Sequence, residues 1–154
     1  MVLAGSADAL VVRTAAFFGP WDAHNFVAAA LETLGAGQPF VAAADLFVSP
    51  TYVPDLANAT LDLLLDEAAG IWHLCNEGVV SWAELARRAA ITVGLDPGLV
   101  QERSWRDLGW VAPRPAFSAL ATQRGRLMDT LDGALSRYAA ARASDLGLAR
   151  GHAA

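Results

Sequence analysis

The sequence predicts an α/β fold, because short apolar runs alternate along its 154 residues with stretches of helical periodicity. The clearest strand-like runs are 9–14 and 70–75. A proline-bracketed segment, residues 49–56, joins a third apolar run at 40–43 to a leucine-rich helix over 55–67. Strand-like and helix-like patterns that follow one another in this way are typical of strands covered by the helices that connect them.

The N-terminal part is expected to begin with a buried strand. Residues 9–14 are apolar and partly β-branched, and they run into a loop over 15–21. Asp22 is a suitable N-cap for an amphipathic helix over 23–34. Gly35-Ala36-Gly37 comes next, but it follows a helix and lacks the third glycine of a dinucleotide-binding turn.

The proline-bracketed segment is expected to be stiff. Pro50 and Pro54 fix φ at about −65° and favour extended conformations at the residues before them, Ser49 and Val53. Pro54 also suits the first position of the following helix.

The hydroxyl groups of this segment belong to Ser49, Thr51 and Tyr52. A rigid loop that presents hydroxyls between a strand and a helix is a suitable place for a polar ligand. The alternative is a strand-to-helix turn that the prolines shape and that holds no ligand.

After the proline-bracketed segment, a predicted helix is again followed by a predicted strand. The helix at 55–67 is so rich in leucine that we expect it to be well buried. Alternation in the strand at 70–75 puts Ile71, His73 and Cys75 on one face and leaves Trp72 and Leu74 on the other.

Three more elements complete the predicted fold. A capping box at Ser81 and Glu84 opens a helix that runs to Val93. A short strand is expected over 100–103, and a last amphipathic helix over about 129–142.

Charge and composition exclude several classes of protein. The net charge is −5, and all 11 basic residues are arginines, so the chain has no basic stripe for nucleic acid and no lysine for catalysis. No apolar run reaches the length of about 18 residues that a membrane span needs. The single cysteine excludes an internal disulfide and is typical of a reducing, cytoplasmic location.

No catalytic or metal-binding pattern is recognisable. The three histidines, His24, His73 and His152, are scattered, and their spacing predicts no metal site. No G-x-S-x-G turn supports a serine hydrolase, and no neighbour is placed to activate Tyr52 as a general acid. The residues alone therefore indicate an α/β module with a candidate ligand loop.

An ordered series of short motifs resembles a known family. The series comprises Arg13-Thr14, Phe17-Phe18-Gly19, Asn25-Phe26, Ser49-Pro50-Thr51-Tyr52, Asp55-Leu56-Ala57, Gly70-Ile71-Trp72-His73-Leu74, Ser81-Trp82, Glu84-Leu85-Ala86 and Arg114-Pro115 with Ser118 and Leu120. From Leu10 to Tyr138 it resembles the C-terminal half of the dTDP-4-dehydrorhamnose reductases, which are extended short-chain dehydrogenase/reductases.

The resemblance implies the C-terminal, substrate-binding part of an extended short-chain dehydrogenase/reductase fold, without most of the Rossmann sheet. It implies a sugar-nucleotide (substrate) binding domain over 1–142 and a flexible C-terminal tail over 143–154. In such reductases an N-terminal Rossmann half carries the glycine-rich loop and a Tyr-x-x-x-Lys pair. That half would be a partner of this chain and would hold the NADPH or NADH; we expect no cofactor to be bound by this chain alone.

The resemblance also implies roles for particular residues. The wall that receives a dTDP-sugar-like ligand matches Asn25, Phe26, Ser49, Pro50, Thr51, Tyr52 and Arg114. Arg13, Thr14 and Phe17 match positions near the cofactor. No catalytic residue and no metal ligand is expected within this chain.

Four positions depart from the family pattern. Ala15 and Ala16 stand where Ser-Trp is usual, and Leu46 and Val48 replace the Gln and Gly of an Asp-Gln-x-Gly motif. Two functions therefore stay open: the substrate-binding domain of a nucleotide-sugar reductase, and a non-catalytic sugar-nucleotide-binding or regulatory module. Neither nucleic acid nor membrane is an expected partner, whereas association between copies of the chain is.

Overall fold

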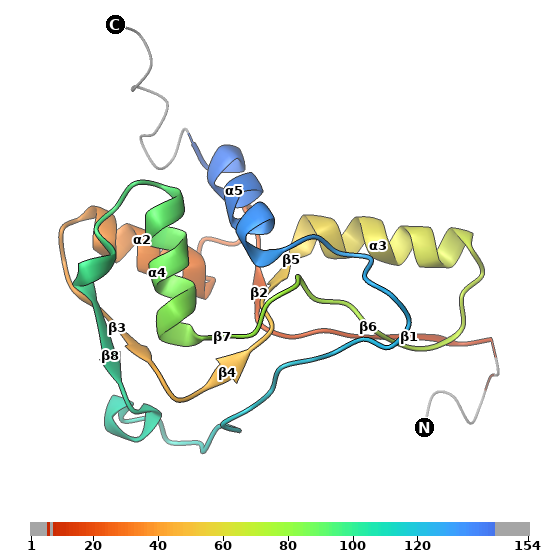
Figure 1. Cartoon of the computed structure of the whole chain (residues 1–154), viewed down its shortest axis with the longest axis horizontal. Coiled ribbons are helices and arrows are strands. Elements are labelled where there is room, and N and C mark those ends of the chain that lie inside the picture. Colours follow the sequence, from red (N-terminus) through yellow and green to blue (C-terminus); the bar gives the residue numbers. More distant parts are fainter. Residues whose placement is uncertain (1–5, 7, 144–154) are drawn as a thin grey trace, which may run out of the picture.

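The computed structural model describes Ser6 and residues 8–143 (Figure 1). Two parallel strand pairs lie at opposite ends of an elongated molecule, and short strands connect them (Figure 1). The elements follow one another as β1 (Leu10–Arg13), β2 (Phe17–Phe18), α2 (Phe26–Gly35), β3 (Phe40–Ala43), β4 (Phe47–Val48), β5 (Thr51–Tyr52), α3 (Val53–Leu65), β6 (Gly70–His73), β7 (Val80–Ser81), α4 (Trp82–Thr92), η1 (Pro97–Leu99), β8 (Val100–Arg103), η2 (Trp105–Leu108) and α5 (Leu131–Ala141). The α/β class predicted from the sequence is confirmed.

One end of the molecule consists of the parallel pair β1–β6 and helix α3. Leu10 pairs with Gly70 and Arg13 with His73. One face of this pair packs on α3, where Leu63 and Ala59 are buried against Leu74 together with Val12 and Trp72. A parallel pair needs a crossover connection, and α3 lies in that connection between the two strands.

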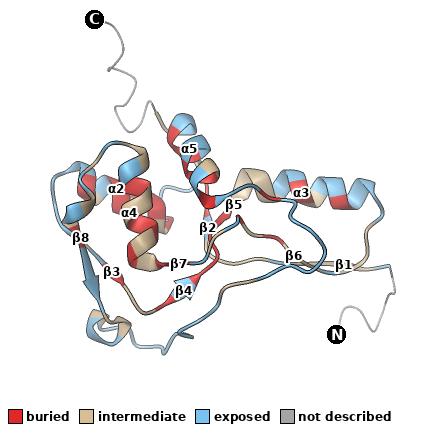
Figure 2. Ribbon diagram, viewed as in Figure 1, coloured by how far each residue is buried: buried red, intermediate tan, exposed pale blue. Residues whose placement is uncertain are grey.

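The other end is built on the parallel pair β3–β8, in which Phe40 pairs with Val100. Helices α2 and α4 pack against each other over small side chains. Ala30 of α2 and Ala83, Ala86 and Ala90 of α4 are all fully buried, which lets the two helix backbones approach closely (Figure 2).

Between the two ends, the pairs β2–β5 and β4–β7 tie the chain together. The largest apolar cluster lies here, where Phe18 and Tyr52 meet Tyr138 of α5. The Phe18 ring lies 5.3 Å from that of Tyr52 and 5.8 Å from that of Tyr138, both within the range of favourable aromatic contacts.

The predicted N-cap of the first helix is wrong by three residues. Helix α2 begins at Phe26, and the side chain of Asn25 accepts the capping hydrogen bond from the backbone N–H of Ala28. Asp22 instead accepts a hydrogen bond from the N–H of His24, which closes a local turn before the helix.

The start of the second helix also differs from the prediction. Val53 is helical, and Tyr52 is the extended residue that precedes the helix, so Pro54 stands at the second helical position. At that position too, the missing N–H of proline costs no intrahelical hydrogen bond. Val53 is therefore helical, although a residue before proline normally prefers an extended conformation.

The prediction that the leucine-rich helix is well buried is wrong. Only Ala59 and Leu63 of α3 are buried, whereas Leu61, Leu64 and Leu65 are 57%, 56% and 81% exposed. Figure 2 shows α3 mainly in the intermediate and exposed colours, whereas α2 and α4 carry more buried residues. One apolar side of the helix packs on the β1–β6 pair through Ala59 and Leu63. The other apolar side, with Leu61, Leu64 and Leu65, is not covered by the described part of this chain.

The remaining predicted elements are present with small shifts in their ends. Strand β3, strand β8 and the Ser81 cap of α4 are confirmed, and the last helix begins at Leu131 behind a Thr130 cap. Strands β2, β4, β5 and β7 were not predicted, because runs of two residues carry no periodicity.

Two further predictions concern the ends of the chain and the membrane. The expected tail falls largely on residues 144–154, which lie outside the described residues. No helix in the described part of the chain is long and apolar enough to cross a membrane.

Candidate functional site

The proline-bracketed segment is held rigidly, as its sequence predicts. Backbone hydrogen bonds fix it from two directions, since Thr51 N–H donates to Ala16 and the carbonyl of Pro50 accepts from Asn76. The N–H of Tyr52 donates to the side-chain oxygen of Asn76 at 2.7 Å. The segment therefore forms part of the sheet framework.

The hydroxyl groups of this segment point into the protein. The Ser49 hydroxyl accepts from the N–H of Leu120 at 3.1 Å and lies 3.3 Å from its carbonyl oxygen. The hydroxyl of Thr51, a fully buried residue, accepts a hydrogen bond from Thr14 at 3.0 Å, and the Tyr52 ring packs in the central cluster. Ser49, Thr51 and Tyr52 thus lie in three different environments.

Asn25 is buried, and its side chain makes contacts within the chain. Its amide nitrogen donates to the carbonyls of Gly19, at 3.2 Å, and Asp22, at 2.5 Å, while its oxygen caps α2. These contacts fix the entry of the chain into α2, and so they position the next residue, Phe26.

The structure brings Phe26 and Arg114 together at a pocket of about 400 Å³. Phe26 contacts the ring of Trp82, with centroids 4.6 Å apart, and the Arg114 guanidinium lies 5.9 Å from the ring centre of Trp110. The full lining is Phe26, Val41, Ala42, Ala43, Leu46, Val48, Trp82, Leu108, Trp110, Arg114, Pro115 and Ser118. We call this the Phe26–Arg114 pocket.

The chemistry of this pocket is apolar and aromatic with one positive charge. Arg114 is its only charged lining residue, and within the described residues the Arg114 guanidinium forms no ion pair. A pocket of this kind suits a ligand that combines a ring with a negatively charged group. Leu46 and Val48, two of the positions that depart from the family pattern, contribute apolar lining.

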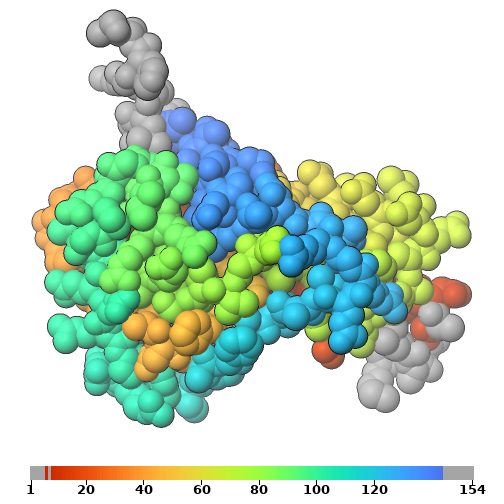
Figure 3. Space-filling model, in the orientation of Figure 1, coloured from red at the N-terminus to blue at the C-terminus, as the bar shows by residue number. Residues whose placement is uncertain are grey.

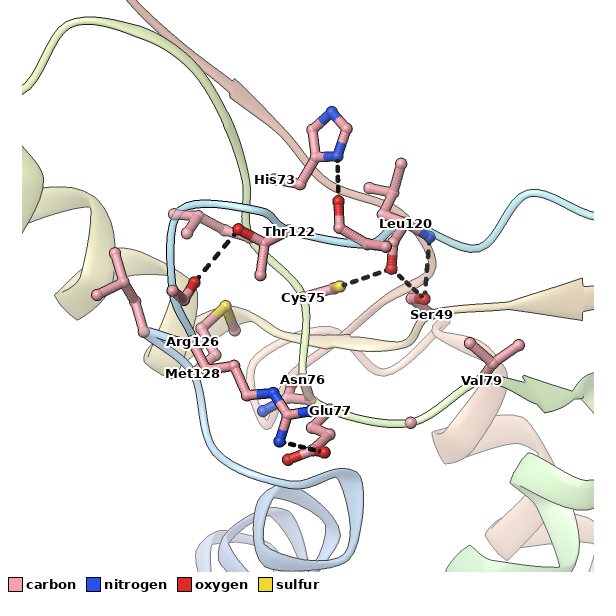
Figure 4. Close-up of a pocket in the computed structure, with 15 residues that line it drawn as sticks. Ser49, His73, Cys75, Asn76, Glu77, Val79, Leu120, Thr122, Arg126 and Met128 are labelled. Carbon is pink, nitrogen blue, oxygen red and sulfur yellow. Dashed lines mark hydrogen bonds and ion pairs between the residues drawn. The ribbon is translucent and has the colours of Figure 1, made fainter.

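A second pocket of about 220 Å³ lies beside the carboxyl end of β6 (Figure 4). Ser49, His73 and Cys75 approach the backbone of residues 120–121, and Arg126 pairs with Glu77 at 2.5 Å (Figure 4). Burial raises the pKa of the Cys75 thiol, which keeps it protonated. The residues of this pocket thus mainly bond to one another.

The three residues expected near the cofactor lie at the end of β1, directly after it, and in β2. Arg13 is exposed at the end of β1, Thr14 bonds to Thr51, and Phe17 of β2 is 53% exposed. Ala16, one of the positions that depart from the family pattern, has a φ of +49°, and its carbonyl oxygen accepts from Thr51. Through Thr14 and Thr51, the region expected near the cofactor contacts the proline-bracketed segment.

Sequence reasoning missed the two tryptophans that line the Phe26–Arg114 pocket. Trp110 stands four residues before Arg114, in a stretch whose aromatic and proline content was its one visible signal. Trp82 is the first residue of α4, directly after the Ser81 cap. Their meeting with Phe26 depends on tertiary packing, which no local pattern encodes.

Within the described residues, no three His, Cys, Asp or Glu side chains are grouped so that they could hold a metal ion.

The fold and the pocket together define a ligand-binding domain of the α/β class, shaped like the C-terminal part of an extended short-chain dehydrogenase/reductase. The chain belongs to the family of RmlD substrate binding domains, whose family model matches residues 1–142. The resemblance expected from the motif series is thereby confirmed.

Two curated relatives indicate what the chain is similar to. It is 38% identical over 125 residues to a dTDP-4-dehydrorhamnose reductase of Mycolicibacterium smegmatis, a match that covers 80% of this chain and 38% of the relative. It is 32% identical over 126 residues to a probable dTDP-4,6-dihydroxy-2-methyloxan-3-one 4-ketoreductase of Streptomyces antibioticus, covering 81% of this chain and 42% of the relative. The chain thus spans about two fifths of the length of these relatives.

A solved structure supports the same family. The dTDP-4-dehydrorhamnose reductase of Bacillus anthracis, crystallised in complex with NADP, superposes with a TM-score of 0.77 at 28% identity. The match covers 84% of this chain and 47% of that one.

Proposed function

We propose that this chain is the substrate-binding domain of a nucleotide-sugar reductase similar to dTDP-4-dehydrorhamnose reductase, and that the Phe26–Arg114 pocket receives part of the nucleotide sugar. The observation that carries the proposal is the Arg114 guanidinium, which lies in an aromatic pocket without a carboxylate partner among the described residues. The names of the relatives, which include a reductase and a ketoreductase for dTDP-sugars, support the substrate class.

The proposed division of roles follows the chemistry of the pocket. The guanidinium of Arg114 contacts the diphosphate, because its planar fork fits two phosphate oxygens at once. The rings of Phe26, Trp82 and Trp110 contact the base or the sugar, since flat apolar surfaces favour ring stacking.

The proline-bracketed segment serves this site as a support in the proposal. Ser49, Pro50, Thr51 and Tyr52 are buried, so they hold the substrate wall in place from behind. Asn25 acts in the same way by fixing the start of α2, and hence the position of Phe26.

The chain's own residues do not fit the dinucleotide cofactor. The sequence has no lysine and no glycine-rich turn of the dinucleotide-binding type. We therefore assign the NADPH or NADH, and the proton-donating pair, to an N-terminal Rossmann half that would be this chain's partner, and we derive no reaction step within this chain.

Titration of dTDP and of a dTDP-sugar against purified variants tests the proposal. Arg114→Ala is expected to weaken binding by on the order of 1.5–3 kcal/mol, or roughly ten- to a hundred-fold, because a charge-assisted contact is lost. Arg106→Ala is the matched control: it removes the same charge from an exposed arginine that stacks on Trp105 outside the pocket. Equal affinity of wild type and Arg114→Ala would place the site elsewhere.

The alternative function, a non-catalytic sugar-nucleotide-binding or regulatory module, is favoured by the departures at Ala15, Ala16, Leu46 and Val48. Both functions predict nucleotide binding, so the coding sequence around this chain separates them. A neighbouring glycine-rich loop and Tyr-x-x-x-Lys motif would support the reductase, and a different domain would support the module.

A further inference from the structure

A loop over residues 105–117 forms part of the wall of the Phe26–Arg114 pocket, together with residues of α2, β3 and α4. Four residues of the loop line the pocket: Leu108, Trp110, Arg114 and Pro115. Figure 1 shows the loop in teal, running from the end of β8 past β4. We call it the 105–117 loop.

Asp45 holds the start of this loop. One oxygen of its carboxylate accepts from the Ser104 hydroxyl at 2.7 Å, and the other accepts from the backbone N–H of Trp105 at 2.9 Å. The backbone N–H of Ala44, the residue before Asp45, donates to the carbonyl of Arg103 at 2.9 Å. These bonds fix the first turn of η2 to the segment that follows β3.

Phe47, which follows closely on Asp45 in the same segment, holds the end of the loop. Its N–H donates to the carbonyl of Ala116, and its carbonyl accepts from the N–H of Ser118, both at 2.9 Å. The rings of Phe47 and Phe117 lie 6.5 Å apart. Because both ends are tied to one short segment, the loop has the form of an Ω-loop, a class of loop that is frequently functional.

Between these two ties, residues 110–115 form an arm that is loosely held. None of their backbone N–H or carbonyl groups forms a hydrogen bond with another described residue, and residues 109–115 are all exposed. Gly109 ends η2 at a φ of +68°, a left-handed conformation that glycine adopts without strain. A segment with so few buried contacts opens more easily than the rest of the fold.

The arm carries two side chains on which the proposed function depends. Trp110 supplies an aromatic face, and Arg114 supplies the one charged group of the pocket lining. The Arg114 guanidinium lies 5.9 Å from the Trp110 ring centre, so the two side chains are placed as a pair. Since no backbone hydrogen bond of the arm itself fixes them, their position at the pocket depends on the ties at the ends of the loop.

From these contacts we propose that Asp45 is a positioning residue for the nucleotide sugar, and that the arm which it ties closes over the bound ligand. Asp45 is not among the residues that line the pocket, so it acts through Trp110 and Arg114. When the tie is lost, the arm spends less time in the binding position, and the apparent affinity falls by the same fraction. The inference rests on the proposed function, because it takes the Phe26–Arg114 pocket as the site.

Calorimetric titration of dTDP against the full chain measures the positioning role. Asp45→Ala is expected to weaken dTDP binding about tenfold, because both hydrogen bonds of the tie are lost. Asp45→Asn is expected to restore most of the affinity, since the amide oxygen can accept from the Trp105 N–H and the amide nitrogen can donate to the Ser104 hydroxyl. Ser104→Ala removes one of the two bonds and should weaken binding about threefold, which keeps the test valid if Asp45→Ala does not fold.

Asp96→Ala is the matched control. The Asp96 carboxylate caps η1 by accepting from the N–H of Gly98 at 2.8 Å, and it lies outside the pocket lining. A purely structural role of Asp45 would lower the free energy of unfolding in Asp45→Ala and leave dTDP binding unchanged. The proposal instead expects a loss of affinity in Asp45→Ala and none in Asp96→Ala.

Hydrogen–deuterium exchange with mass spectrometry measures the closure of the arm. Without ligand, the amides of residues 110–115 should exchange rapidly, because they form no hydrogen bonds within the described chain. Saturating dTDP should slow this exchange at least about tenfold in wild type and leave the exchange of α3 unchanged.

Unchanged exchange of the arm in the dTDP-saturated wild type would overturn this inference while leaving the pocket in place. Equal affinity of wild type, Asp45→Ala and Ser104→Ala would do the same. An equal loss of affinity in Asp96→Ala would also overturn it, since the effect would then come from the fold in general. If dTDP does not bind to wild type at all, the proposed function fails and this inference fails with it.

Discussion

The hydroxyl of Thr14 donates a 3.0 Å hydrogen bond to the hydroxyl of Thr51, and so joins the residue after β1 to the first residue of β5. The two residues come from the regions expected near the cofactor and near the substrate. Thr51 is fully buried, so water does not replace this bond when one partner is removed.

Thr51→Val is therefore expected to lower the free energy of unfolding by about 1–2 kcal/mol, because the shape is kept while Thr14 loses its partner. Urea denaturation measures the change. Thr92→Val is the matched control, since the Thr92 hydroxyl bonds to its own helix at Arg88. A double-mutant cycle with Thr14→Val that showed no coupling would contradict the importance of this bond.

Asn76 connects three parts of the chain, and its loss should be more severe. It is 1% exposed, its oxygen accepts from Tyr52, and its amide nitrogen donates to Asp55 and to the carbonyl of Asp129. Asn76→Ala is expected to cost roughly 2–4 kcal/mol, because it leaves the buried N–H of Tyr52 without an acceptor.

The control for this substitution is Asn58→Ala on the exposed side of α3. It replaces the same residue type at a site without buried polar partners, and thermal and urea unfolding should place it close to wild type. If both variants lost a similar amount of unfolding free energy, the buried hydrogen bonds of Asn76 would not explain the effect.

Stability should fall in acid because of two carboxylates. Hydrogen bonds from the Ser104 hydroxyl and the Trp105 N–H hold the pKa of Asp45 below its ordinary value of 3.8, and Arg137 and the Thr130 N–H do the same for the pKa of Asp129. A lowered pKa in the folded state means that the unfolded chain binds protons first. The stabilisation is thus complete above the ordinary value and is lost as the pH falls below it.

The expected outcome is a urea midpoint that drops between about pH 5 and pH 3, with a smaller drop in the double variant Asp45→Asn, Asp129→Asn. Asp62→Asn on the exposed side of α3 serves as the control. An unchanged pH profile in the double variant would refute the assignment to these two groups.

The exposed leucines of α3 predict association between copies of the chain. Leu61, Leu64 and Leu65 are more than half exposed on one helix, and β1 has β6 as its one paired neighbour among the described strands. Exposed apolar surface and an open strand edge both favour contact with another chain. Sedimentation velocity should show association that increases with concentration.

Replacement of these three leucines by glutamine should shift the chain toward the monomer, whereas Val111→Gln, at a fully exposed site on another surface, should not. A monomer at every concentration, without dye-binding apolar surface, would contradict this prediction.

The sequence predicts those parts of the fold that local patterns control. The Ser81 cap, strands β3 and β8 and the two faces of β6 follow from capping chemistry and alternation, and all are found. The start of α2 was misplaced because Asp22 and Asn25 are both good caps, and only the contacts of Asn25 with Gly19 and Asp22 decide between them.

The candidate site was predictable only in part. Phe26 and Arg114 were named from the resemblance, and the structure places both at one pocket. Trp82 and Trp110 were missed, because they reach that pocket through the packing of α4 and of the segment after η2. Figure 3 shows the green and blue-green parts of the chain, which include these two segments, next to each other on the surface. The prediction that α3 is well buried was wrong for a similar reason. The sequence shows that the helix is apolar, but it does not show whether other parts of the same chain cover its leucines.

The pairing of β1 with β6 also has a consequence for biosynthesis. Leu10 leaves the ribosome long before Gly70, its partner in the register, so the β1–β6 pair forms only after α2, β3 and α3 have been made. Arg137 of the last helix, which binds Asp55, arrives later still. The contacts that close this part of the fold thus join segments far apart in sequence, and because long loops must close before such contacts form, folding through them is expected to be slow.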